Sequence, residues 1–178
     1  MISKRNIFLI GPMGSGKTAV GRQLARLFRL SFYDSDAEIE TKTGVDIAFI
    51  FEKEGEAGFR QREKEAIDRL TQMEGIVLAT GGGAVSEADN RRVLSERGVV
   101  VYLETSVGQQ IERTRHARHR PLLNDTDAQL TLETLMQRRA QLYAEIADIT
   151  VSTDARRVQL VAEEIYSELH RLQSQPGQ

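Results

Sequence analysis

The sequence predicts an α/β fold in which a mostly parallel β-sheet is covered by helices on both faces. Short apolar runs of strand length alternate along the chain with longer segments in which apolar residues recur at helical spacing. Alternation of this kind is typical of parallel sheets with right-handed crossover connections. The run at 75–80 is almost entirely apolar, as expected of a strand that is buried on both faces.

Length and pattern together indicate one domain. The 178 residues are enough for a real core but few for two domains. We therefore expect a single domain over 1–173, followed by a disordered tail at 174–178. We expect strands at 7–10, 31–33, 75–80, 99–103 and 149–151, and helices at 20–28, 37–42, 45–53, 56–73, 87–97, 132–146 and 158–172.

Composition excludes several classes of protein. The formal net charge of -2 provides no overall field for nucleic acid or an anionic membrane surface. The chain has no cysteine, so disulfides and thiolate metal sites are excluded. It has neither a signal-peptide pattern nor the run of roughly 18 apolar residues that a membrane helix needs. We expect a soluble cytoplasmic protein with no nucleic-acid or membrane partner.

The most informative stretch is Gly-Pro-Met-Gly-Ser-Gly-Lys-Thr at 11–18, between the first strand and the first helix. Its glycines allow successive main-chain N–H groups to converge on phosphate oxygens at the positive end of the helix. Lys17 adds a positive charge for the β- and γ-phosphates, and the Thr18 hydroxyl can bind Mg²⁺. A turn that only capped a helix would need neither residue. The stretch therefore predicts a nucleotide-phosphate site.

Two further segments follow strands and carry candidate site residues. Asp34 and Asp36 stand two residues apart, so in extended backbone both carboxylates point into one space at a strand end. Alternatively, Asp36 caps a helix at 37–42. Three consecutive glycines, 81–83, follow the strand at 75–80, and a plain turn seldom needs more than one. We infer that something approaches this backbone too closely for any side chain.

Arginines provide the remaining candidates. Arg60 lies near the start of a charged helix and could simply be solvated or ion-paired. Arg139 falls on the apolar face of the helix at 132–146, where a buried guanidinium must meet an anion or acceptor. Its partner is either an internal carboxylate or an anionic ligand in a cleft, and the sequence leaves both possibilities open.

A basic run precedes Pro121. It contains Arg113, Arg115, His116, Arg118, His119 and Arg120. The run is either a solvated basic surface or, next to a nucleotide loop, a lid that carries arginine to the phosphates. A metal site at His116 and His119 is disfavoured by the cationic neighbours.

The chain resembles the shikimate kinase family over nearly its whole length, from about 6 to 172. The resemblance rests on the phosphate loop, Asp34-Ser35-Asp36, Gly81-Gly82-Gly83, Arg120-Pro121-Leu122-Leu123 and Arg139-Ala140-Gln141-Leu142-Tyr143, in this order. It implies a three-layer α/β/α fold of the P-loop kinase type, with a five-stranded parallel sheet, a substrate-binding region at about 34–62 and a lid at about 112–126. The implied reaction transfers the γ-phosphoryl group of ATP to the 3-hydroxyl of shikimate, on the route to chorismate and the aromatic amino acids.

The resemblance also implies a role for each matching residue. Lys17, Asp36 and Arg120 would be catalytic, with Asp36 accepting a hydrogen bond from the attacking hydroxyl. ATP would be bound by Gly14, Ser15, Gly16, Lys17, Thr18, Ala19, Arg113, Arg120 and Arg156. Shikimate would be bound by Asp36, Arg60, Gly81, Gly82, Gly83 and Arg139. Thr18 and Asp34 would hold Mg²⁺, and the family implies a monomer.

Two rival functions can be weighed against this one. A gluconate kinase of the same build would also aim arginines at a carboxylate, but the triple glycine and the paired aspartates favour shikimate. An RNA-binding module would use the basic run at 113–120. The negative net charge and the aromatic content of only 6%, which leaves few rings for stacking on bases, oppose that alternative.

Overall fold

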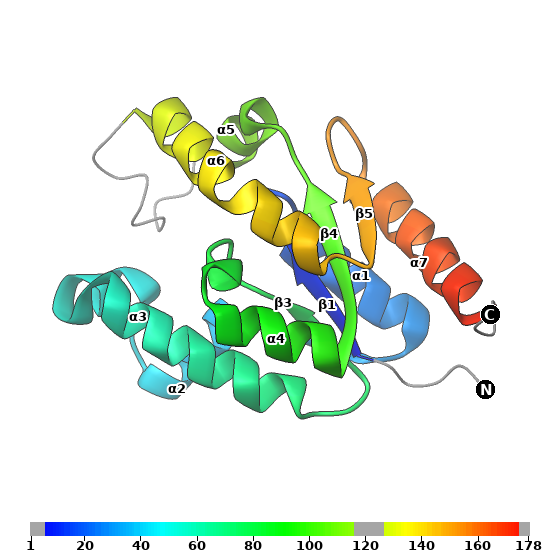
Figure 1. The fold of residues 1–178 in the computed structure, drawn as a ribbon, viewed down its shortest axis with the longest axis horizontal. Coiled ribbons are helices and arrows are strands. Elements are labelled where there is room, and N and C mark those ends of the chain that lie inside the picture. Colours follow the sequence, from blue (N-terminus) through cyan, green and yellow to red (C-terminus); the bar gives the residue numbers. More distant parts are fainter. Residues whose placement is uncertain (1–5, 116–126, 175–178) are drawn as a thin grey trace.

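The computed structural model describes residues 6–115 and 127–174, and its centre is a five-stranded sheet (Figure 1). The strands are β1 (Asn6–Ile10), β2 (Ser31–Asp34), β3 (Ile76–Ala79), β4 (Gly98–Glu104) and β5 (Ile149–Ser152). All neighbouring strands pair in parallel, in the order β2-β3-β1-β4-β5. The predicted parallel α/β sheet is confirmed.

Helices cover both faces of this sheet (Figure 1). They are α1 (Lys17–Phe28), α2 (Ser35–Thr43), α3 (Ile47–Thr71), α4 (Ala88–Arg97), α5 (Val107–Thr114), α6 (Ala128–Ile146) and α7 (Val158–Ser174), with a short 3₁₀ turn, η1 (Ala84–Ser86). Helices α1 and α7 pack together on one face, whereas α3, α4 and α6 contribute to the apolar cluster on the other. The result is the three-layer arrangement that the sequence predicts.

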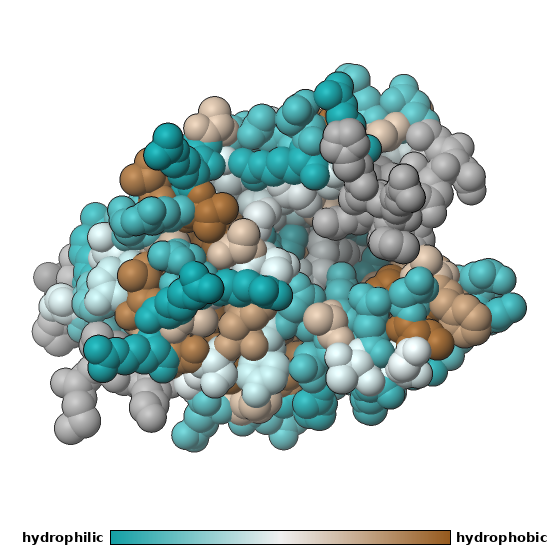
Figure 2. Space-filling view, turned by 180° about the vertical axis from the view of Figure 1, so that it is seen from behind, coloured by the Kyte–Doolittle hydropathy of each residue, from teal (hydrophilic) through white to brown (hydrophobic). Residues whose placement is uncertain are grey.

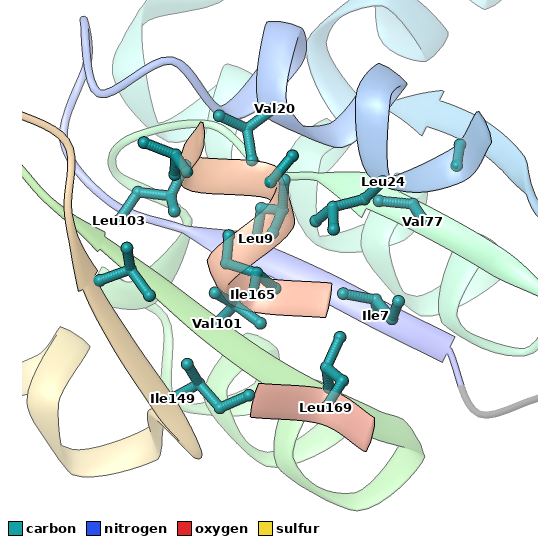
Figure 3. Packing of buried hydrophobic residues seen from close by; sticks show 14 residues of the cluster. Ile7, Leu9, Val20, Leu24, Val77, Val101, Leu103, Ile149, Ile165 and Leu169 are labelled. Atoms are coloured by element: carbon teal, nitrogen blue, oxygen red, sulfur yellow. The ribbon is translucent and has the colours of Figure 1, made fainter. Parts of the chain in front are cut away.

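The period of two along the strands divides the core between these faces. In β1, Ile7 and Leu9 pack toward α1 and α7, while Phe8 and Ile10 join the opposite cluster. Figure 3 shows the first cluster, in which Ile165 and Leu169 of α7 lie over the strands. Because both faces of β1 are buried, its residues after Asn6 are all apolar.

Several predicted boundaries differ from the structure. The segments expected at 45–53 and 56–73 form one assigned helix, α3, which is interrupted by non-helical backbone angles at Gly55. Helix α6 begins at Ala128, four residues before the expected start at 132. Ser174, expected in the tail, is the last residue of α7, and 175–178 lie outside the described residues.

The strand order determines where a ligand can bind. All five strands run in the same direction, so their carboxyl ends meet at one edge of the sheet. After β1 the chain moves outward to β2 and β3 on one side, then crosses to β4 and β5 on the other. Open α/β sheets bind ligands at such a switch point, and here the phosphate loop follows β1 directly.

Within the ranges 6–115 and 127–174, none of the helices combines the length and apolarity needed to cross a membrane.

Candidate active site

A cavity of about 610 Å³ opens at the carboxyl edge of the sheet. Figure 2 shows the surface hollowed between the part of the molecule that contains α3 and the part that contains α5 and α6. Most predicted site residues line the cavity: Gly14, Gly16, Lys17, Thr18, Ala19, Asp34, Asp36, Arg60, Gly81, Gly82, Gly83, Arg113 and Arg139. The fold therefore brings together residues that span 126 positions of sequence, from 14 to 139.

The phosphate loop forms the floor of this cavity between β1 and α1. Gly14 and Gly16 have φ angles of 75° and 89°, in the left-handed region that side chains disfavour. Gly16 is also the N-cap of α1 and has no side chain to cap it. The N–H groups of the first turn of α1 are therefore suited to binding an anion, with the helix dipole adding to the attraction.

Lys17 lies against the loop that precedes it. Its Nζ donates hydrogen bonds to the carbonyl oxygens of Gly11 at 2.7 Å and Pro12 at 2.8 Å, and to Ser15 Oγ at 3.3 Å. These contacts hold the ammonium group at the mouth of the loop. Ser15 itself is fully buried and does not line the cavity, so its contact with Lys17 is part of the loop's internal structure.

Thr18 and Asp34 come together across the site. Thr18 Oγ1 donates a hydrogen bond of 2.7 Å to Asp34 Oδ2. The other oxygen, Asp34 Oδ1, accepts from the main-chain N–H groups of Asp36 and Ala37 and caps α2. The proposed capping role of Asp36 is therefore wrong, because β2 ends one residue after the predicted boundary and Asp34 becomes the N-cap.

This pair of oxygens is compatible with Mg²⁺. Magnesium prefers oxygen ligands and commonly takes one or two from the protein, with the rest from water and nucleotide phosphates. Thr18 and Asp34 offer a hydroxyl and a carboxylate at the cavity wall, beside the phosphate loop. Within the described residues no group of three or more His, Asp or Glu side chains could hold a metal by itself, so phosphate oxygens and water would have to complete the coordination.

Asp36 reaches the same cavity by a different route from the one predicted. It lies in the first turn of α2, not in extended backbone beside Asp34. The two carboxylates nevertheless line one cavity because the strand passes into the helix without a loop. Ser35 Oγ accepts a hydrogen bond of 3.1 Å from the N–H of Gly81, which ties this turn to the glycine loop.

Arg60 enters the cavity from α3 and is held by two carboxylates. Nη1 donates to Glu63 Oε1 at 2.8 Å, and Nη2 donates to Glu56 at 3.3 Å. The guanidinium also lies over the ring of Phe59, 5.3 Å from its centroid. Burial by itself would lower the pKa of Arg60, but the charges of Glu63 and Glu56 raise it overall, so this side chain remains a cation.

Glu63 is a site residue that sequence reasoning missed. Its side chain is completely buried and lines the cavity, and within the described residues its Oε2 atom has no hydrogen-bond partner. Burial raises the pKa of this carboxyl, against the opposing effects of Arg60 and Arg139. One signal was available: Glu63 shares the buried face of α3 with Phe59 and Ile67, where a charge demands a partner.

The three glycines each pack against a different part of the site. A β-carbon on Gly81 would lie 2.5 Å from Glu63 Oε2 and 3.1 Å from Asp36 Oδ1. One on Gly82 would lie 3.0 Å from the main-chain nitrogen of Met13 in the phosphate loop. One on Gly83 would overlap the guanidinium of Arg60. The expected close approach is confirmed, and the protein's own groups account for it.

Arg139 lies on the inner face of α6, and only 7% of its surface is exposed. Within the described residues no carboxylate lies at ion-pair distance from it, although the charge of the buried Glu63 acts on it. Tyr143 follows one helical turn later. The structure thus provides no carboxylate in direct contact with Arg139 among the described residues. Of the two possibilities that the sequence left open, a ligand anion is favoured.

Arg113 lies at the other end of the cavity and joins two loops. It donates to the carbonyl oxygen of Gly14 at 3.1 Å and to the carbonyl oxygen of Thr153, after β5, at 2.6 Å. Arg156 does not line the cavity; it donates to the carbonyl of Ser152 and pairs with Glu164 of α7.

The predicted lid falls largely on residues that the structure does not describe. Residues 112–114 are the end of α5, whereas Arg120, His116 and His119 lie outside the described residues.

Fold and site together define a class of protein. A glycine-rich loop that joins β1 to α1 of a parallel sheet shares its cavity with a carboxylate, Asp36, and two buried or half-buried arginines, Arg60 and Arg139. This combination is that of a P-loop kinase whose acceptor is a small acid.

Comparison with known proteins identifies the family. The family model for shikimate kinase matches residues 13–170. A shikimate kinase of Shewanella amazonensis is 53% identical over 95% of this chain and 99% of its own length. A solved shikimate kinase of Acinetobacter baumannii, in complex with shikimate, is 45% identical, with a TM-score of 0.96 over 98% of this chain and 97% of that one. The chain belongs to the shikimate kinase family.

The comparison with gluconate kinase, the rival function considered from the sequence, shows a shared fold only. A gluconokinase of Sinorhizobium meliloti superposes with a TM-score of 0.62 over 98% of this chain and all of its own, at 19% identity. Similarity at this level shows a shared architecture and says nothing about the substrate.

Proposed function

We propose that this member of the family transfers the γ-phosphoryl group of ATP to the 3-hydroxyl of shikimate, and that the residues of the 610 Å³ cavity perform the reaction. One observation carries the proposal: the same cavity is lined by Lys17 of the phosphate loop, by Asp36 and by the two arginines, Arg60 and Arg139. A nucleotide triphosphate on the loop would therefore face an acid held by the arginines, with a carboxylate between them.

The phosphate loop supplies the nucleotide site in this proposal. The main-chain N–H groups of 14–19 would bind the phosphates, and the Nζ of Lys17 would exchange its carbonyl contacts for phosphate oxygens. Arg113, which already joins the phosphate loop to Thr153, would border the base. To contact the base, Arg156 would have to break its ion pair with Glu164. Arg120 would reach the phosphates from the lid.

The acid would be bound at the other end of the cavity. Arg60 and Arg139 both carry planar guanidinium groups that match a carboxylate in two hydrogen bonds. Glu63 compensates part of the charge of Arg60, so two cations facing one carboxylate do not leave a large uncompensated positive charge. Glycines 81–83 would present bare main chain to the ring and its hydroxyls.

Asp36 would then orient the attacking hydroxyl. Phosphoryl transfer depends mostly on positioning and on neutralising charge, so a strongly basic group is unnecessary. A hydrogen bond from the 3-hydroxyl to Asp36 would direct the oxygen to the phosphorus, and the carboxylate would accept the proton late in the reaction. Lys17 would stabilise the charge that develops on the transferred group.

Mg²⁺ is the expected cofactor. Thr18 and Asp34 would hold it, and the bound ion would neutralise charge on the β- and γ-phosphates. Mutual hydrogen bonding and the N-cap of α2 hold these two side chains in position before any ion arrives.

We also propose the division of the single domain, 1–173, into a phosphate-binding part, a substrate region at about 34–62 and a lid at about 112–126. We further propose that the enzyme acts as a monomer in the cytoplasm, without a nucleic-acid partner.

A coupled assay of ADP release tests the reaction directly. With Mg·ATP fixed, the purified protein should release ADP only when shikimate is added, and gluconate and quinate should give far lower kcat/KM. Raising the salt concentration from 50 to about 200 mM should change the rate little, whereas nucleic-acid binding would weaken steeply. Equal turnover of gluconate and shikimate would refute the proposed acceptor.

A further inference from the structure

Tyr143 is a buried residue that neither the phosphate loop nor the arginine pair accounts for. It lies on α6 one turn after Arg139, and only 1% of its surface is exposed. Its ring stacks on Tyr102 of β4, with the ring centroids 5.0 Å apart. A phenylalanine would fill the same space, so packing alone does not explain the hydroxyl.

The hydroxyl joins two parts of the acid site. It donates a hydrogen bond of 2.5 Å to the carbonyl oxygen of Gly82, 61 residues away in sequence. Arg139 lies one helical turn before Tyr143 on α6, near enough for its charge to act on the same hydroxyl. A single phenol therefore lies between the arginine that faces the cavity and the main chain of the glycine loop.

The geometry gives this contact a directional effect. The carbonyl of Gly82 and the N–H of Gly83 belong to one planar trans peptide, so their bonds point in opposite directions. Tyr143 does not line the main cavity, whereas Gly82 and Gly83 do. By holding the carbonyl on the protein side, the hydroxyl fixes the plane of the peptide that the cavity exposes.

The hydroxyl is also available as a donor at any working pH. Burial raises the pKa of Tyr143 far above its usual range, and the charge of Arg139 offsets this only in part. The proton therefore stays on the phenol, and the hydrogen bond to Gly82 is not lost by titration.

We propose that Tyr143 is a positioning residue for the acid substrate. Its hydroxyl fixes the position of the Gly82 peptide relative to the Arg139 guanidinium, so that the carboxylate and the ring of the substrate can be bound at the same time. This inference rests on the proposed function, because it assigns the substrate acid to that end of the cavity. Tyr143 touches no reacting atom, and it acts through the two groups that it joins.

Tyr143→Phe is the primary test, because it removes the hydroxyl and keeps the ring and its stack. We expect the KM for shikimate to rise roughly 5- to 50-fold, as expected from the loss of one or two buried hydrogen bonds. The KM for ATP and the affinity for ADP should stay within about twofold, since the phosphate loop is unaffected. Tyr102→Phe is the matched control: Tyr102 shares the stack, and within the described residues its hydroxyl makes no hydrogen bond.

The alternative is a purely structural tyrosine. In that case Tyr143→Phe would lower the melting temperature and leave the KM for shikimate unchanged, and this result would overturn the inference. Equal increases in both KM values would also overturn it. Circular dichroism and ADP titration establish that the variant is folded before the kinetics are compared.

A double-mutant cycle separates this inference from the proposed function. If Tyr143 acts through Arg139, the losses from Arg139→Lys and Tyr143→Phe should not add, and the double variant should lose less than the product of the single effects. Multiplicative losses would place the action of Tyr143 elsewhere. If the wild-type protein does not phosphorylate shikimate, the proposed function is refuted. If it does, but the effects of the two substitutions are additive in free energy, the proposed function stands and the coupling between Tyr143 and Arg139 is refuted.

Discussion

Gly83 and Arg60 occupy adjoining space so tightly that a β-carbon on Gly83 would overlap the guanidinium. The arginine is confined on its other sides by Glu63, by Glu56 and by the ring of Phe59. Its position is therefore fixed by a glycine as much as by its ion pairs. We therefore expect the third glycine of the loop to serve the binding of the acid by leaving room for Arg60.

Gly83→Ala should displace Arg60 and weaken binding of the acid. We expect the KM for shikimate to rise about 10- to 100-fold, because small displacements of positioning groups have effects of this size. Gly108→Ala, in α5, is the control, because the nearest atom to its added β-carbon is 4.0 Å away. Steady-state kinetics with each substrate varied would detect the difference, and an unchanged KM for shikimate would contradict the crowding argument.

Removal of either arginine should affect the two substrates unequally. Charge-assisted hydrogen bonds contribute roughly 1.5 to 3 kcal/mol each, so Arg60→Ala or Arg139→Ala should raise the KM for shikimate at least tenfold more than that for ATP. Arg92→Ala removes an exposed arginine that pairs with Glu96, and it should change neither value. Parallel increases for both substrates would count against the assignment of the acid site.

Asp36→Asn should slow turnover and leave nucleotide binding intact. The amide keeps the size of the side chain but cannot take the proton from the hydroxyl, so we expect kcat to fall on the order of 10²- to 10⁴-fold. Calorimetric titration should give an ADP affinity close to that of the wild type. Asp89→Asn, at an exposed ion pair with Lys64, serves as the control. Wild-type turnover in the Asp36 variant would remove this residue from the mechanism.

Thr18 and Asp34 should determine how strongly magnesium promotes nucleotide binding. Thr18→Ala and Asp34→Asn should each raise the Mg²⁺ concentration that half-maximally tightens ADP binding by roughly tenfold or more. Asparagine keeps the N-cap of α2, so the fold should persist. Thr43→Ala, which removes a hydroxyl elsewhere in α2, is the control. An unaltered Mg²⁺ dependence in both site variants would place the ion elsewhere.

Glu63 should make the stability of the protein depend on pH. Burial raises the pKa of Glu63 above its usual value of 4.5, so between 4.5 and the folded-state pKa the folded chain binds more protons than the unfolded chain. The free energy of unfolding should therefore fall as pH rises through this window. Below pH 4.5, Glu63 should make no contribution to the pH dependence of stability.

Glu63→Gln should flatten that slope. Urea unfolding at a series of pH values from about 4.5 upward measures the effect, with the exposed Glu133→Gln as a control. If the free energy of unfolding depends on pH in the same way in the wild type and in Glu63→Gln, the Glu63 carboxyl is ionised in both the folded and the unfolded state over this range.

Much of the fold follows from local pattern. The central strands β1 and β3 are largely apolar runs buried on both faces, and the phosphate loop is specified by glycines and by Lys17, so both were predictable from a short window. The boundaries of the elements were harder to predict. Asp34 accepts a hydrogen bond from Thr18 and caps α2, and both contacts depend on how β2 passes into α2. Helix α2 begins two residues earlier than predicted, so its N-cap is Asp34 instead of Asp36.

The site was harder to predict where a side chain gains its role from tertiary contacts. Arg60 and Glu63, three residues apart on a charged helix, have the pattern of a surface ion pair, and only packing against the glycine loop buries them. Tyr143 read as an ordinary core residue, because its acceptor, Gly82, is 61 residues distant. Arg139 was found because a lone cation on an apolar face already lacks a local explanation.

Residues that would bind the acceptor come mostly from segments around β2 and β3, but Arg139 is supplied by α6, between β4 and β5. The contacts of Arg113 with Gly14 and Thr153 join the phosphate loop to the β4 and β5 side. A chimera that exchanges both 31–83 and 128–146 between related kinases should therefore inherit the donor's choice of acid while keeping the host's phosphate loop. In such an architecture, new acceptors can evolve without rebuilding the machinery that handles the phosphate.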